Sequence, residues 1–116
     1  MIGSGSYIVI HLQNPKEKFW GLLVELNHAG ATVLGIDLHS FEDWTRMIVA
    51  NERNIGLTAM FLPMWRIERI SLDQTVDDLL SLQAQFELRT GLPVHRYIEG
   101  QLPDMHRGGE GDPEQM

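Results

Sequence analysis

The chain has 116 residues, 43% of them hydrophobic and none of them cysteine, and it carries a formal net charge of −7. One compact domain fits this length and composition, and disulfides, thiolate metal sites and cysteine nucleophiles are excluded. The N-terminus lacks the basic region and apolar run of a secretion signal, and no apolar stretch approaches the roughly 18 residues that span a bilayer. We therefore expect a cytoplasmic protein without a membrane partner, whose acidic balance disfavours nucleic acid.

Strand patterns dominate the first part of the chain. A β-rich run covers 7–12 and ends before a proline, which lacks the N–H group that a strand ladder needs. A second run over 19–26 contains Gly21, and an internal glycine favours a bend or bulge in a strand. The polar turn 27–30 then leads into a third run over 31–38. These runs predict three consecutive antiparallel strands.

The pattern changes at Ser40, which is followed closely by acidic residues and has the form of a helix start. Apolar residues at spacings of three and four predict a helix over about 41–50. A strand pattern resumes over 57–62, is broken by Pro63, and continues over 66–72. The sequence therefore predicts five strands, with a helix inserted between the third and the fourth.

A second helix is predicted over about 76–89, with Asp73 or Thr75 as its N-terminal cap. A glycine and then a proline follow its expected end, which is common where helices stop. Residues 94–98 are expected to add one short packed turn or strand. This C-terminal helix would cover one open end of the strand structure.

The domain boundary is predicted where apolar residues become sparse in the sequence. Residues 1–99 are expected to form a single domain, whereas 100–116 are rich in glycine, proline and acids and are expected to be a flexible tail. The predicted fold class is mainly β with added helices. Its centre is a small, bent, five-stranded antiparallel barrel.

Two segments have the form of known family motifs. Residues 30–39 (GATVLGIDLH) contain a glycine, apolar positions and then Asp-x-His, and residues 62–70 (LPMWRIERI) contain an arginine and two spaced isoleucines. Together they resemble the motifs of the Sm-like small β-barrel, the fold of Sm, LSm and Hfq proteins, over about residues 7–72. The related SH3-like barrel stays an open alternative. The resemblance implies that Asp37 and His39 match positions used near bound RNA.

Apolar side chains at the hinge between the last two strands predict a contact surface. Met64 and Trp65 are too apolar to leave in water and suit a subunit or partner interface, with Phe61 and Ile67 beside them. As the alternative, these side chains belong to the core and rim of the barrel. In the Sm-like family the last two strands pair neighbouring subunits, so the resemblance implies a homo-oligomer. The leading hypothesis is a non-catalytic Sm-like oligomerisation or interaction domain without a metal or cofactor.

Two other functions stay open as alternatives. An RNA-binding Sm-like protein would use Asp37, His39, Arg66 and Arg69. A small hydrolase or metal enzyme would use His11 together with Asp37 and His39, since alternate residues of a strand face the same side. A metal would need a third ligand, and an Asp-x-His pair at a strand end is more often a hydrogen bond that positions the following helix.

Overall fold

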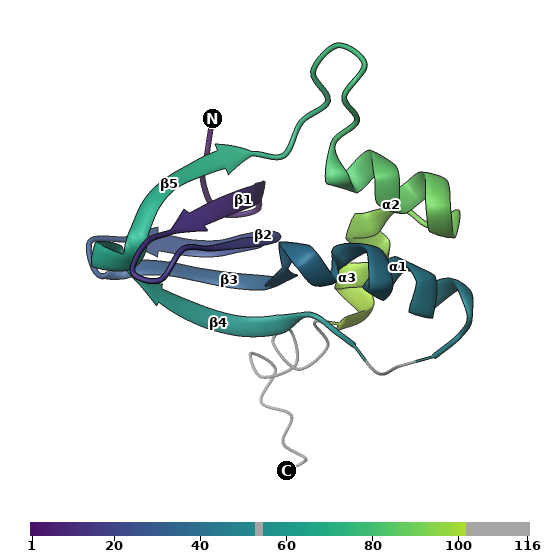
Figure 1. The fold of residues 1–116 in the computed structure, drawn as a ribbon, viewed down its shortest axis with the longest axis horizontal. Coiled ribbons are helices and arrows are strands. Elements are labelled where there is room, and N and C mark those ends of the chain that lie inside the picture. Colours follow the sequence, from purple (N-terminus) through teal and green to yellow (C-terminus); the bar gives the residue numbers. More distant parts are fainter. Residues whose placement is uncertain (53–54, 102–116) are drawn as a thin grey trace.

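The computed structural model describes residues 1–52 and 55–101, and its central feature is a five-stranded antiparallel sheet. The strands are β1 (Tyr7–Leu12), β2 (Glu17–Asn27), β3 (Gly30–Asp37), β4 (Thr58–Pro63) and β5 (Ile67–Leu72). Their order is β4-β3-β2-β1-β5, so four strands lie side by side in chain order and β5 returns to pair with β1 (Figure 1). β4 and β5 therefore form the two edges of the sheet.

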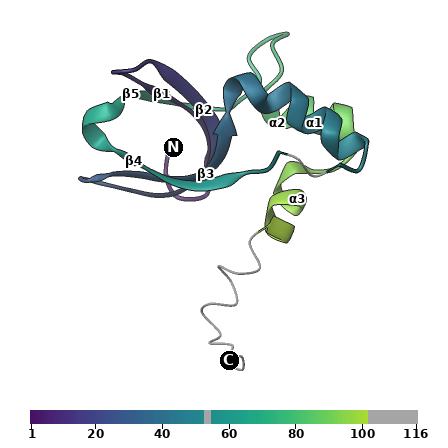
Figure 2. The ribbon, with the colours of Figure 1, turned by 60° about the horizontal axis from the view of Figure 1, so that its bottom comes forward.

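The helices gather at one end of the molecule, while the strands occupy the other (Figures 1 and 2). They are α1 (Phe41–Val49), between β3 and β4, and α2 (Leu82–Thr90) and α3 (Val94–Gln101), after β5. Two 3-10 helices, η1 (Leu38–Ser40) and η2 (Met64–Arg66), join β3 to α1 and β4 to β5. The predicted antiparallel sheet and its inserted helix are thereby confirmed.

The sheet buries a different set of side chains on each face. In β1, Ile8, Ile10 and Leu12 are at most 2% exposed, whereas the side chains between them point to the opposite face. The first face carries what we call the strand core, made by Ile8, Ile10, Leu12, Leu23, Ala31, Val33 and Leu62. The second face carries the helix core, in which the sheet residues Trp20, Leu34 and Ile36 pack against Phe41, Trp44, Phe86, Val94 and Ile98 of the helices. Both faces of the sheet are thus covered by apolar packing.

The internal glycines of β2 and β3 lie directly opposite each other. Gly21 pairs with Gly35, and a Cβ atom on Gly21 would lie 2.3 Å from the backbone oxygen of Leu34. No real side chain fits at that distance, so the two strands approach each other closely only because both positions lack a Cβ. The ladder also shifts register between Leu23 and Glu25, the kind of irregularity that bends a strand.

The predicted barrel is not closed. β4 and β5 form no ladder with each other, and the ribbon shows η2 joining them at one end while they diverge toward the helices (Figures 1 and 2). A tight turn between β4 and β5 would have paired them as a hairpin. The 3-10 helix η2 connects them instead and keeps the two strands apart. The backbone N–H of Met64 donates to the carbonyl of Ala29 at 2.8 Å, which holds η2 against the β2–β3 turn.

The second predicted helix begins later than expected, at Leu82 rather than near residue 76. Val76 and Leu79 exchange two backbone hydrogen bonds, at 2.8 and 2.9 Å, and close a tight turn at a point where the apolar spacing predicted helix. Ser81 is the N-cap residue, and its hydroxyl accepts from the N–H of Ala84 at 3.0 Å. Asp73, one of the two predicted caps, still serves α2, because its carboxylate accepts from the N–H of Leu82 at 2.7 Å.

The region after residue 93 also differs from its prediction. The short turn or strand expected over 94–98 is the first part of α3, which continues to Gln101. The predicted tail over 100–116 therefore begins inside a helix, and its remainder, 102–116, lies outside the described residues.

Candidate functional site

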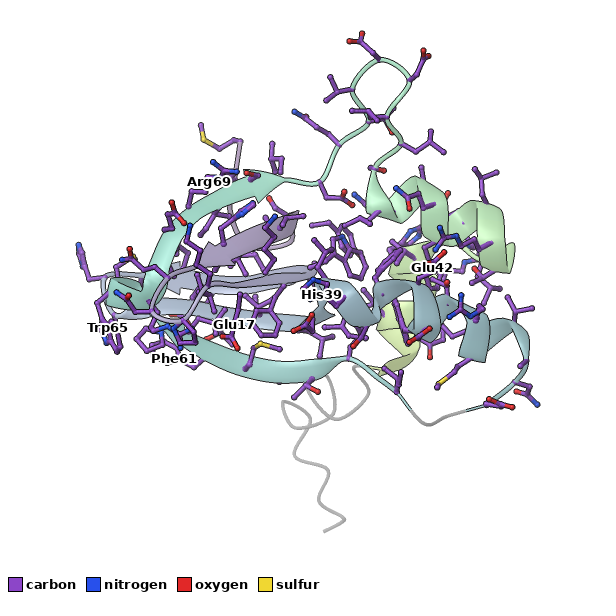
Figure 3. The ribbon with its side chains drawn as sticks, in the orientation of Figure 1. Glu17, His39, Glu42, Phe61, Trp65 and Arg69 are labelled. Carbon is purple, nitrogen blue, oxygen red and sulfur yellow. The ribbon has the colours of Figure 1, made fainter. Side chains whose placement is uncertain are left out.

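A polar pocket of about 470 Å³ lies at one end of β1 and β2, and we call it the basic pocket. Figure 3 shows two of its members, His39 and Arg69, on the strand side of the helices. Its basic lining comprises His11, Lys16, Lys18, His39 and Arg69, and the remaining lining residues are Leu12, Glu17 and Glu68. Lysine, arginine and histidine side chains thus come together from three strands, one loop and η1.

Strand register brings three of these side chains into one row. His11 of β1 lies directly opposite Lys18 of β2 on one side and opposite Arg69 of β5 on the other. Residues directly opposite each other in neighbouring strands share a face of the sheet. The alternation in β1 that buries Ile10 and Leu12 in the strand core therefore turns His11 into the pocket.

His39 reaches the pocket from the short helix that follows β3. The carboxylate of Asp37 accepts from the backbone N–H of His39 at 2.8 Å and lies 3.3 Å from its Nδ1 atom. The imidazole of His39 is 97% exposed. Asp37 thus caps η1 and orients the His39 side chain, and it does not itself line the pocket.

The charge balance in the pocket is positive, against the sign of the whole chain. Within residues 1–52 and 55–101, Lys16, Lys18 and Arg69 form no ion pair, whereas Glu17 is paired with Arg66 at 2.9 Å. Three lining cations face two lining carboxylates, and Glu68 is the carboxylate without such a partner. The lining side chains therefore sum to about +1, in a chain of net charge −7.

The protonation state of His11 reflects this environment. Burial lowers the pKa of His11 below its ordinary value of 6.5, and the nearby charges of Arg69 and Lys18 lower it further. The carboxylate of Glu68 acts in the opposite direction and does not compensate. His11 is consequently neutral at pH 7, with one ring nitrogen available as a hydrogen-bond donor.

Arg66, one of the predicted RNA-contacting residues, is engaged within the protein. Its guanidinium donates to the carbonyl of Gln13 at 2.8 Å, to the carbonyl of Pro15 at 3.1 Å and to the carboxylate of Glu17 at 2.9 Å. These bonds hold the β1–β2 loop, which carries Lys16, against η2. The structure therefore brings His39 and Arg69 of the predicted set to one pocket and places Arg66 as a positioning residue beside it.

The predicted catalytic set of His11, Asp37 and His39 is only partly assembled. His11 and His39 both line the basic pocket, while the carboxylate of Asp37 is bound to His39. Among the described residues, no three histidine, aspartate or glutamate side chains are grouped so that they could hold a metal ion.

The predicted interface residues form an apolar surface at the opposite end of the sheet from the helices. Phe61, Met64 and Trp65 are 52%, 40% and 68% exposed, and we call them the hinge patch. Figure 3 shows Phe61 and Trp65 at the end of the molecule where β4 passes into η2. Ile67, the fourth predicted member, is half-buried and packs against the strand core. The side chain of Gln13 donates to the carbonyl of Trp65 at 3.0 Å, which fixes the backbone of η2.

A second hollow, about 640 Å³ and thus larger than the basic pocket, lies beside α1. Both of its arginines are already ion-paired, Arg46 with Asp43 and Arg89 with Glu42 at 3.7 Å. The arginines of this hollow are therefore paired within the helical layer, whereas Lys16, Lys18 and Arg69 of the basic pocket are not paired within the described residues.

The sequence alone does not predict that Lys16 and Lys18 line a pocket. It also gives no indication that His11 and Arg69 line the same pocket. The signal that was present is the strict alternation of β1, which places His11 on the face opposite to Ile10. The pairing of β1 with β5 has no comparable local signal, because these residues are far apart in the chain.

No protein-family model, curated protein or solved structure matches the chain. In the part of the chain that the structure describes, no helix has the length and apolar character needed to span a lipid bilayer.

Proposed function

We propose that this chain is a non-catalytic, Sm-like interaction domain that assembles with further copies of itself through the free edges of its sheet. One observation carries the proposal: β4 and β5 are both edge strands, and the η2 segment that joins them exposes large apolar side chains. In the proposed assembly, β4 of one copy pairs with β5 of the next copy. The hinge patch is covered by this contact.

The two edges are suited to backbone pairing. β4 and β5 are each six residues long, and each pairs with a neighbouring strand on one side only. An uncovered strand edge is a template for pairing with another chain. Because the two edges differ, the contact is heterologous and repeats head to tail, and it closes into a ring when the rotation between copies permits.

The hinge patch supports the proposal energetically. Large apolar side chains each contribute about 1.5–3 kcal/mol when they move from full exposure to full burial. Trp65 is the most exposed member of the patch, and tryptophan is enriched among the residues that dominate protein interfaces. A contact that covers Phe61, Met64 and Trp65 therefore adds a substantial hydrophobic contribution to the pairing of the strands.

The non-catalytic part of the proposal follows from the state of the predicted catalytic residues. Asp37, the carboxylate of that set, already accepts the backbone N–H of His39 and lies close to its ring. His11 is flanked by Lys18 and Arg69, cations that disfavour its protonated form. The lowered pKa leaves the imidazole of His11 neutral but makes it a weaker proton acceptor, which argues against an efficient general base at this position.

Substitution of Trp65 by glutamate tests the assembly. Light scattering coupled to size exclusion should give the wild-type chain a mass that is a multiple of 13.2 kDa, and Trp65→Glu should return the mass to that of one chain. The introduced carboxylate would have to be desolvated in the contact, which costs several kcal/mol. Circular dichroism should remain that of the folded wild type, because Trp65 is exposed in the single chain.

The matched control is Leu88→Glu, at a position on α2 that is 74% exposed and lies outside the hinge patch. It introduces the same charge in place of another exposed apolar side chain, and the assembly should keep its mass. A wild-type chain that runs as a monomer, or an equal loss of mass with both substitutions, would overturn the proposed contact.

A further inference from the structure

The basic pocket contains a row of cations that the fold leaves unneutralised. Lys18 and Arg69 flank His11 in directly opposite positions of three neighbouring strands, and neither cation forms an ion pair within the described residues. Basic side chains placed around one centre repel each other, and like charges in neighbouring strands are destabilising. The protein supplies a carboxylate close by, Glu17, and pairs it with Arg66 instead.

The pocket is a hollow in the surface, and its net charge is opposite in sign to that of the whole chain. Its volume of about 470 Å³ lies in the range typical of small-molecule sites. A neutral His11 at its floor offers a ring N–H, while Lys16 and His39 stand at its rim. The arrangement thus presents several hydrogen-bond donors and a local positive charge around one hollow.

We propose that the basic pocket binds a phosphoryl group of a small, soluble ligand. Lys18 and Arg69 hold the phosphoryl oxygens from either side, and His11 donates a hydrogen bond from between them. Arginine binds such oxygens through two parallel N–H groups, and lysine acts as a point charge. Arg66 acts as a positioning residue, because it fixes the loop that presents Lys16.

The observations favour a small ligand over a nucleic acid. The excess of acids in the chain, sixteen against nine bases, repels an extended polyanion at long range. The row of basic residues spans only β2, β1 and β5 within one pocket, and Glu17 and Glu68 also line that pocket. One or two phosphoryl groups can be held between the two cations without approaching other acidic parts of the surface.

Binding of an anion would change the electrostatic environment of His11 so that it favours the protonated imidazole. In the free protein, burial, Arg69 and Lys18 act against protonation of His11, while Glu68 favours it. Lys16 and His39 also line the pocket, and Glu17 is paired with Arg66. A bound dianion between the two cations adds negative charge beside the imidazole, so the pKa of His11 rises on binding. By linkage, affinity for the anion then increases as pH falls through the range in which His11 takes up its proton.

The test is a titration of the full chain with pyrophosphate, followed by chemical shifts of backbone amides and histidine rings. We expect saturable changes confined to the pocket, and Arg69→Gln and Lys18→Gln should each weaken binding by about tenfold. The control Arg96→Gln removes an exposed arginine from α3 and should change the affinity by less than about twofold. Retained spectral dispersion shows that each variant is folded.

Sulfate serves as a second probe, because it stays doubly charged across the pH range in which phosphates titrate. Because His39 also lines the pocket, the pH series is recorded in a His39→Gln background. Affinity for sulfate should still rise there between pH 8 and pH 6, and the further change His11→Gln should remove that rise. No binding of either anion at millimolar concentration, or an equal loss of affinity with Arg96→Gln and Arg69→Gln, would overturn the proposal.

A single-stranded RNA of about ten nucleotides separates the two sources of phosphoryl groups. If the pocket binds a small ligand, the RNA should bind no more tightly than pyrophosphate. RNA binding that is much tighter, depends on Arg69 and falls steeply with salt would instead assign the pocket to nucleic acid and reject the small ligand.

Discussion

Strand alternation determines where the side chain of His11 lies, and burial and neighbouring charges determine its pKa. The alternation of β1 removes it from the strand core, and the register with β2 and β5 places it between Lys18 and Arg69. Burial and these two cations lower its pKa below the ordinary 6.5. Because the unfolded chain then binds this proton more tightly than the folded chain does, acid acts against folding at this residue.

We therefore predict that His11 makes the folded state less stable in acid. Its effect is absent well above pH 6.5 and grows as pH falls below that value and through the lower pKa of the folded state. His11→Gln should remove this part of the pH dependence. The measurement is urea unfolding of both proteins between pH 8 and pH 4.5, with the difference in free energy of unfolding taken at each pH.

Arg69→Gln is the matched second variant for this prediction. It removes one cation beside the imidazole, so the pKa of His11 should move back toward its ordinary value, as seen by titration of the ring signals. A difference between wild type and His11→Gln that does not change with pH would contradict the assignment.

Asp73 connects elements that are distant in the sequence. Its carboxylate accepts from the indole N–H of Trp20 at 3.0 Å and from the backbone N–H groups of Leu82 and Gln83 at 2.7 and 3.0 Å. The first of these donors belongs to the sheet, and the other two belong to the first turn of α2. A single carboxylate thus ties the start of α2 to a buried tryptophan of β2 and satisfies N–H groups that a helix start leaves free.

Asp73→Ala is predicted to lower the free energy of unfolding by about 2–3 kcal/mol, since it removes a helix cap and leaves the Trp20 indole without its acceptor. Urea unfolding at neutral pH measures this effect. Asp78→Ala is the control, at an exposed position of the same loop, and should stay within about 0.5 kcal/mol of wild type. Equal effects of the two substitutions would show that Asp73 has no special role.

The sequence predicts the strands and α1 because their patterns are local. It does not predict the contacts that depend on which strands pair. Strand alternation and turn residues place the strands and α1 within one or two residues of their observed ends. The early start predicted for α2 has a physical cause, because Val76, Leu79 and Leu80 have helical spacing and yet flank a tight turn. The basic pocket depends on the register of β1 with β5, which no local pattern encodes. The exposed apolar residues of the hinge patch, by contrast, lie within five consecutive positions of the chain, so a local pattern indicates them.

The whole molecule is organised around one sheet with a core on each face. The strand core contains Ile10 of β1 at 0% exposure, and the helix core contains Ile98 of α3 at 1% exposure. β2 contributes to both, through Leu23 on one face and Trp20 on the other. Unfolding of either core would therefore uncover a strand that the other core needs.

This arrangement predicts a single cooperative transition. Ile10→Val and Ile98→Val each delete one buried methylene group from a different core, and each should cost about 0.5–1.5 kcal/mol. Both should shift the midpoint of urea unfolding, followed by far-ultraviolet circular dichroism, without changing its slope. A second transition that only Ile98→Val displaces would show instead that the helices unfold separately from the sheet.

The placement of the three tryptophans gives the unmodified protein a built-in optical reporter. Trp20 and Trp44 are fully buried, while Trp65 is 68% exposed on the hinge patch. A soluble quencher such as acrylamide therefore reaches mainly one indole, and the other two provide a constant reference emission. Burial of Trp65 in a contact between copies would protect it from the quencher and move its emission to shorter wavelength. Dilution of the unlabelled chain in a fluorimeter can thus follow dissociation at concentrations too low for light scattering.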